Sequence, residues 1–184
     1  MIALIVISFL ISAVAVLVFM RNARRHARVY GKDMPQRFHR GHIPRLGGAG
    51  ILLGTGAAWL AAGLPNDPFN VRWPLSVSGL TLLCIAPAVL GGIWEDVTQR
   101  VSVRVRLAVT TGSALLLCWL FGLGVYRTGV PLFDGWLQAV PYAALLFAVL
   151  AISGLSHAFN IIDGYNGLAG TVAVQVCLAI THVS

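Results

Sequence analysis

The sequence predicts an all-α protein, a polytopic transmembrane helical bundle of about six spans. Only 10% of its 184 residues are charged and 58% are hydrophobic, whereas soluble domains carry roughly 25% charged residues. The apolar residues gather in stretches close to the ~20 residues with which a helix crosses a bilayer. None shows the alternation of a barrel strand. A water-soluble globule is therefore excluded.

Six apolar stretches define the expected spans: 2–20, 46–64, 75–94, 105–124, 137–156 and 168–184. With short connections they use the whole chain, so we expect 1–184 to form a single transmembrane domain. Ser12-Ala13-Val14-Ala15 could imitate a signal-peptide cleavage site. However, arginines follow the first stretch and no positive charge precedes it, which favours a retained anchor.

The basic residues predict the orientation. The 21–45 connection carries eight of the thirteen Lys and Arg residues, and Arg100, Arg104 and Arg106 fall on the same side if the spans alternate. The positive-inside rule makes that side cytoplasmic and places the N-terminus outside. The net charge of +7 is thus a topology signal, and no nucleic-acid partner is expected because the basic residues stay close to the membrane.

An acidic pair, Glu95-Asp96, directly follows the third stretch. Two adjacent carboxylates repel each other, so a cation is expected beside them. Mg²⁺ is the natural candidate, because proteins bind it through one or two carboxylates together with substrate phosphates. An alternative is that the pair forms ordinary interfacial ion pairs with Arg100 and Arg104.

The third cytoplasmic connection holds Asn160, Asp163 and Asn166, which recur every three residues and would share one face of a helical turn. Ionisable residues at such a depth are candidates for function. The alternative is a polar hairpin turn, since Asp-Gly and Asn-Gly are common turn pairs.

The first cytoplasmic connection contains Lys32, Asp33, Arg37, His39 and His42. These residues fit contact with phosphates, although a basic patch facing lipid headgroups predicts the same composition. Together the three connections offer carboxylates, amides and cations at a membrane edge. Transfer of a phosphoryl-linked group needs these groups, because its catalysis is mostly positioning and charge neutralisation.

These motifs resemble a known family, the polyprenyl-phosphate N-acetylhexosamine-1-phosphate transferases. The resemblance runs through Asp33-Met34-Pro35, Ile43-Pro44-Arg45-Leu46-Gly47-Gly48, the acidic pair and the segment from His157 to Leu168. That last segment resembles the specific signature Asn-x-x-Asn-x-x-Asp-Gly-x-x-Gly-Leu. The short first connection, Arg-Phe-His-Arg-Gly-His, is similar to the GlcNAc-type branch.

The resemblance implies an Mg²⁺-dependent enzyme at the cytoplasmic face of the bacterial inner membrane. It would move a sugar-1-phosphate from a UDP-amino-sugar to undecaprenyl phosphate, a first membrane step of cell-envelope polysaccharide synthesis. The implied roles are as follows: Glu95 and Asp96 for metal and catalysis, Asp163 for catalysis, Asn160 and Asn166 for the nucleotide, and Lys32, Asp33, His39 and Arg104 for phosphates or loop positioning. A homodimer is an open alternative for the assembly.

Three departures qualify the resemblance. Glu95 replaces the first Asp of the usual Asp-Asp pair, His157 replaces the signature's first Asn, and Asn166 replaces an Asp. Family members are also longer and carry a later Gly-Asp-x-Gly motif, so we expect 1–184 to be the N-terminal part of a transferase domain, with little activity alone. An inactive truncated scaffold is one alternative. A small transporter subunit is another, although the spans hold almost no ionisable residues in their middles.

Overall fold

A computed structural model describes residues 2–23, 47–64, 74–98, 100–162 and 167–183. These residues form seven helices and, within the same ranges, no strand. The helices are α1 (Ile2–Ala23), α2 (Gly47–Ala62), α3 (Leu75–Thr98), α4 (Val103–Phe121), α5 (Pro131–Ala139), α6 (Pro141–Ile162) and α7 (Leu168–Val183). The predicted all-α fold class is confirmed.

Four helices, α1, α3, α4 and α6, are long and apolar enough to cross a membrane. The apolar helices α2 and α7 are shorter, at 16 residues each. Large apolar side chains point outward from all six, for example Phe9, which is 69% exposed, and Leu83, which is 66% exposed. Because lipid replaces water around such helices, this outward apolar surface is expected of a membrane bundle.

Small residues fill the helix contacts. Gly50 and Gly54 of α2 lie against Ser12 and Val16 of α1, so closely that a Cβ atom at either glycine would collide with α1. The core between α4 and α6 is formed by Ala114, Cys118, Ala148 and Val149. Close backbone approach through small residues is the usual way that helices pack in membranes, and it fixes α4 against α6 near the site described below.

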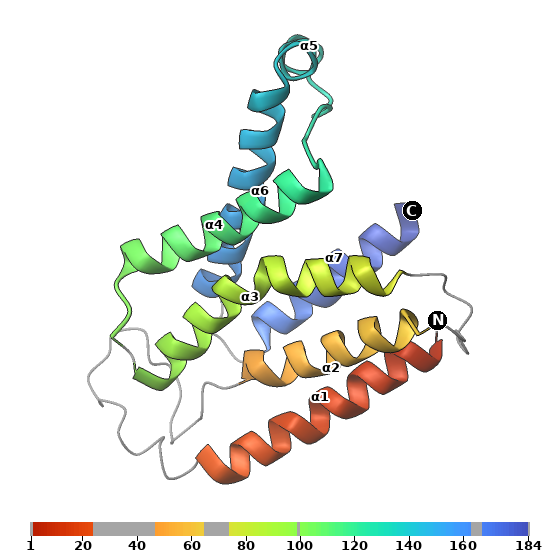
Figure 1. Ribbon diagram of the computed structural model, residues 1–184, viewed down its shortest axis with the longest axis vertical. Helices are drawn as coiled ribbons and strands as arrows, with labels where there is room; N and C mark the ends of the chain where they lie inside the picture. Colours follow the sequence, from red (N-terminus) through yellow and green to blue (C-terminus); the bar gives the residue numbers. More distant parts are fainter. Residues whose placement is uncertain (1, 24–46, 65–73, 99, 163–166, 184) are drawn as a thin grey trace.

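A proline bends α3 halfway along its length. Pro87 lies inside the helix, where it lacks the amide hydrogen of a regular helical residue. The next amide, that of Ala88, donates to Ser113 Oγ of α4 at 3.0 Å, and Figure 1 shows α3 changing direction in its middle. The acidic end of α3 therefore takes its direction from a proline and from a contact with α4.

The fifth predicted span, 137–156, is wrong in its bounds. The structure divides this region into the short α5 and the long α6, with a break at Val140. Pro141 causes the break, because proline is tolerated in the first turn of a helix and not in its interior. Two predicted connections also begin as helix: Glu95 and Asp96 lie in the last turns of α3, and His157 and Asn160 lie near the end of α6.

Candidate active site

The site lies where α3 ends, α4 begins and α6 ends. Thr98 Oγ1 donates to the carbonyl oxygen of Trp94 at 2.7 Å in the last turn of α3. Ser102 caps α4, with its Oγ accepting from the amide of Val105 at 3.3 Å. The chain thus turns from α3 into α4 within a few residues, and this turn brings the acidic end of α3 beside the first turns of α4.

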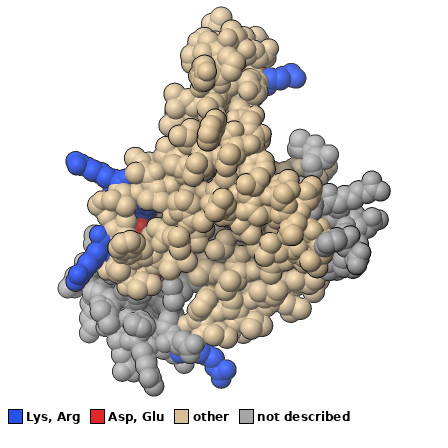
Figure 2. All heavy atoms as spheres, viewed as in Figure 1, with Lys and Arg blue, Asp and Glu red and all other residues tan. Residues whose placement is uncertain are grey.

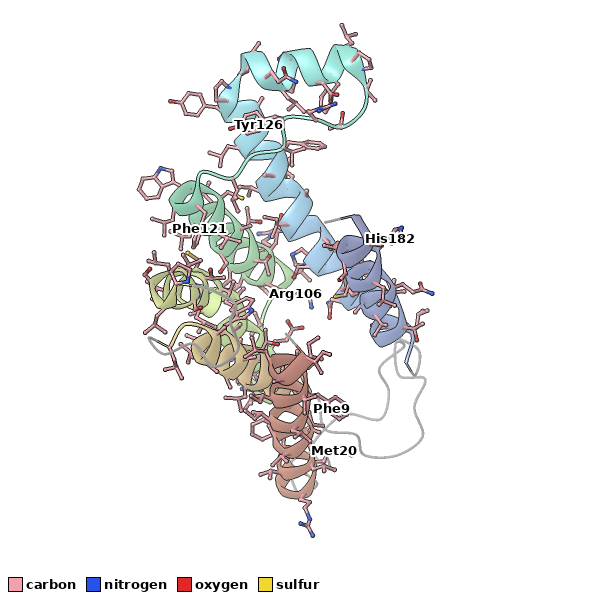
Figure 3. The ribbon with its side chains drawn as sticks, turned by 90° about the vertical axis from the view of Figure 1, so that its right-hand side faces the viewer. Phe9, Met20, Arg106, Phe121, Tyr126 and His182 are labelled. Carbon is pink, nitrogen blue, oxygen red and sulfur yellow. The ribbon has the colours of Figure 1, made fainter. Side chains whose placement is uncertain are left out.

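An ion pair joins the two helices. Arg106 Nη1 lies 2.8 Å from Glu95 Oε1. The two side chains are 30% and 29% exposed, so the pair is half-buried and less screened than a surface pair. Figure 3 labels Arg106 at the inner end of α4, close to α6. One carboxylate of the acidic pair is therefore held by a neighbouring helix.

Arg106 has one side-chain donor, Nε, that the ion pair with Glu95 does not use. Its Nε atom is buried and has no hydrogen-bond partner among the residues that the structure describes. A buried donor without a partner is costly, and a guanidinium presents its N–H groups in a fork that matches phosphate oxygens. Arg106 thus holds Glu95 through Nη1, while its buried Nε has no hydrogen-bond partner among the described residues.

A second polar contact joins α4 to α6. Thr110 Oγ1 lies 3.0 Å from His157 Nε2, and the same oxygen lies 3.0 Å from the carbonyl oxygen of Arg106. Thr110 follows Arg106 by one helical turn, so both side chains project from one face of α4. That face contacts the acidic end of α3 through Arg106 and the polar end of α6 through Thr110.

The charges at this end of the molecule are mixed. Asp96 is half-buried beside Glu95, whereas Arg100 and Arg104 are exposed. In Figure 2 the acidic atoms lie recessed between basic side chains. Recessed carboxylates with arginines around them suit a substrate that carries phosphates and arrives with a cation.

The predicted site residues divide into two groups. Glu95, Asp96, Arg104 and Asn160 are described: Glu95 and Asp96 lie together, Arg104 is exposed in the first turn of α4, and Asn160 is exposed in the last turn of α6. The others, Lys32, Asp33, His39, Asp163 and Asn166, lie outside the described residues. Within the described ranges, no three His, Cys, Asp or Glu side chains gather as a metal site.

Sequence reasoning missed Arg106 and Thr110 as members of the site. It considered Arg100 and Arg104 as partners of the acidic pair, but Glu95 pairs with Arg106. The available signal was a charged residue just inside an apolar span, since such a residue needs a partner. No feature of the sequence indicated Thr110, because threonine is common in membrane helices.

The sequence profile described as "Glycosyl transferase family 4" matches residues 78–184. This match covers more than half of the chain and includes Glu95, Asp96, Arg106 and Asn160. The chain belongs to glycosyl transferase family 4.

Individual relatives of this chain are also named as transferases. A Bacillus subtilis protein named as a probable undecaprenyl-phosphate N-acetylglucosaminyl 1-phosphate transferase is 29% identical, over 92% of this chain and 45% of its own length. A Saccharolobus solfataricus protein, named as a putative UDP-N-acetylglucosamine–dolichyl-phosphate N-acetylglucosaminephosphotransferase, is 27% identical over 97% of this chain and 52% of its own length. A Mycobacterium protein named as a phospho-N-acetylmuramoyl-pentapeptide-transferase is 28% identical, over 94% of this chain and 52% of its own length.

The chain spans about half the length of the curated relatives that it matches. No solved structure matches it significantly. All three relatives are named as transferases, and two of the names include undecaprenyl phosphate or dolichyl phosphate. This chain is a member of a transferase family, and four of its helices are long and apolar enough to cross a membrane.

Proposed function

We propose that this chain forms part of an enzyme that transfers N-acetylhexosamine-1-phosphate from a UDP-sugar to undecaprenyl phosphate. The observation that carries the proposal is the acidic pair at the end of α3, with Glu95 held 2.8 Å from Arg106 on α4. The names of the relatives support the substrate classes. The proposed enzyme works at the cytoplasmic face of a bacterial inner membrane, where the arginine-rich connections would lie.

The proposed reaction is a phosphoryl transfer. An oxygen of the lipid phosphate attacks the β-phosphorus of the UDP-sugar and forms a new P–O bond. The bond from that phosphorus to the bridging oxygen breaks, and UMP leaves with the bonding electron pair. Asp96 orients the lipid phosphate or takes its proton. A two-step route through a covalent intermediate on a carboxylate also balances, and both routes release UMP.

The charges on the diphosphate must be neutralised. Adjacent carboxylates are the donors that Mg²⁺ accepts alongside substrate phosphates, so the Glu95-Asp96 pair fits this ion. Glu95 Oε1 is engaged by Arg106, so Glu95 would contribute only its remaining oxygen to a metal, beside a carboxylate oxygen of Asp96. Bound Mg²⁺ supplies charge neutralisation on the phosphates.

The remaining residues carry proposed binding roles. Asn160 and Asn166 would contact the nucleotide, and Asp163 would take part in catalysis. Lys32, Asp33, His39 and Arg104 would meet phosphates or position their loops. Of these residues, Asn160 in the last turn of α6 and Arg104 in the first turn of α4 have exposed side chains, which a substrate can reach. A homodimer stays a prediction.

Labelled donor tests the proposal. Membranes that contain the product of the complete gene are incubated with UDP-N-acetylglucosamine labelled in the sugar, undecaprenyl phosphate and Mg²⁺. Membranes that contain residues 1–184 alone serve as the comparison. We expect label in the lipid fraction with the complete product and little with residues 1–184. No label in lipid with either would overturn the assignment for this substrate.

A further inference from the structure

We infer that His157 is a positioning residue, which fixes the end of α6 against α4 by donating a hydrogen bond from Nε2 to Thr110. The inference rests on the proposed function, because it concerns the same site. His157 is the residue at which this chain departs from the signature asparagine. The structure shows a specific partner for it, Thr110 Oγ1 at 3.0 Å.

The direction of this hydrogen bond follows from counting hydrogens. Thr110 Oγ1 carries one hydrogen and lies within 3.0 Å of two carbonyl oxygens, those of Arg106 and Leu107. Carbonyl oxygens only accept, so the hydroxyl donates to the backbone and its oxygen accepts from the ring. With the hydroxyl hydrogen directed to the backbone, Nε2 of His157 is the donor in the arrangement that we infer.

The contact matters because of what each helix carries. On α4, Arg106 precedes Thr110 by one turn and holds Glu95 at 2.8 Å. On α6, Asn160 follows His157 by three residues and lies in the last turn. One face of α4 thus contacts both neighbouring helices, since Arg106 binds Glu95 of α3 and Thr110 binds His157 of α6, the helix that carries Asn160.

The reach of the side chain explains why a histidine suits this position. The Nε2 atom of histidine lies three bonds from Cβ, as does the amide nitrogen of glutamine. The amide nitrogen of asparagine lies only two bonds from Cβ. Glutamine can therefore reproduce the donor, whereas the asparagine of the family signature cannot reach Thr110 from the same backbone position.

Conservative variants test the inference through kinetics. In membranes containing the complete gene product, we expect H157N and T110V each to raise KM for UDP-N-acetylglucosamine about three- to tenfold, as the loss of one hydrogen bond implies. H157Q and T110S should stay within about twofold of wild type. The double variant T110V/H157N should be no worse than either single variant, because both remove the same bond.

A distance measurement tests the inference independently of activity. Nitroxide labels are placed at Val97 and Ile161, which flank Asp96 and Asn160 and are 61% and 78% exposed. Exposed Cys177 is replaced by serine. We expect a narrow distance distribution in wild type and H157Q, and a broader one in H157N and T110V.

The two measurements separate the possible failures. Wild-type membranes without transfer, but with the expected distance distributions, would overturn the proposed function and leave the positioning role supported. Transfer in wild type, with H157N matching it in KM and in distance distribution, would overturn the positioning role. Equal losses in H157Q and H157N would also overturn it, because the Nε2 donor would then be irrelevant.

Discussion

Two acidic side chains in this protein are held in opposite ways. Glu95 pairs with Arg106, which lies on another helix and carries a full charge. Asp134, in the first turn of α5, accepts hydrogen bonds from the amide and the hydroxyl of Thr128, at 2.5 and 2.7 Å, and from the amide of Gly129 at 3.2 Å. Asp134 is therefore bound by its own loop, whereas Glu95 depends on how two helices pack.

The Asp134 contacts stabilise local structure, whereas the Glu95 pair belongs to the candidate active site. The Asp134 contacts close a turn, with Gly129 in the left-handed region at φ +88°, and they satisfy the amides that precede α5. They join the loop to the first turn of α5. The Glu95 pair belongs to a set of contacts that joins α3, α4 and α6. Side chains brought together from three helices are typical of a site that must hold a substrate in a defined geometry.

The largest expected effect is the loss of transfer on replacing the reacting carboxylate. Asp96→Asn should reduce label transfer by roughly a hundredfold or more, as the loss of an acid–base group implies, with membrane insertion unchanged. The matched variant Asp134→Asn should transfer label at close to the wild-type rate. Both are measured with labelled UDP-N-acetylglucosamine in membranes. Equal transfer rates in the two variants would contradict a catalytic role for the acidic pair that the Asp134 region does not share.

The second effect concerns the arginines. Arg106→Met keeps the aliphatic part of the side chain and removes the partner of Glu95, so the free energy of unfolding should fall by about 1–2 kcal/mol for a half-buried pair. Arg127→Met, beside the Asp134 loop, should change it by under about 0.5 kcal/mol. Chemical denaturation in detergent micelles measures both. If Glu95→Gln fails to reduce the cost of Arg106→Met, the ion pair does not contribute as described.

A third effect tests whether the side-chain length of Glu95 is needed for its contact with Arg106. Glu95→Asp retains the charge and restores the acidic pair usual in the family, but it withdraws the carboxylate by one methylene from Arg106. We expect a roughly threefold to tenfold fall in kcat/KM, consistent with weakening one charge-assisted hydrogen bond. Activity above wild type would show that the glutamate is not matched to Arg106.

The smallest effect is a pH dependence confined to the Asp134 loop. The hydrogen bonds from Thr128 lower the pKa of Asp134 from its ordinary value. An aspartate with a lowered folded-state pKa stabilises the protein above the unfolded value of about 3.9, and this contribution is lost as the pH falls through the folded value. The difference in stability between wild type and Asp134→Asn should therefore be constant near neutral pH and shrink in acid. A difference that grows in acid would contradict the assignment.

Much of the fold could be predicted from the sequence, because span length and hydropathy are local properties. Five of the six predicted stretches match observed helices to within about four residues, and Pro141 displaced the fifth; four of the helices are long and apolar enough to cross a membrane. The acidic pair was also predicted as a candidate site. Its partner was not, since the contact of Glu95 with Arg106 depends on the short turn between α3 and α4, and that of Thr110 with His157 depends on packing between α4 and α6. Which side chains of two neighbouring helices meet is decided by how the helices pack against each other.

The most direct test of the central claim follows the β-phosphorus of the donor. Membranes containing the complete gene product are incubated with undecaprenyl phosphate and UDP-N-acetylglucosamine labelled with ³²P at the β-phosphate. Transfer of a sugar-1-phosphate predicts that the label enters the lipid fraction while unlabelled UMP is released, and that Asp96→Asn prevents both. Label that stays in water as UDP while the sugar enters the lipid would show transfer of the sugar alone, and would contradict the account.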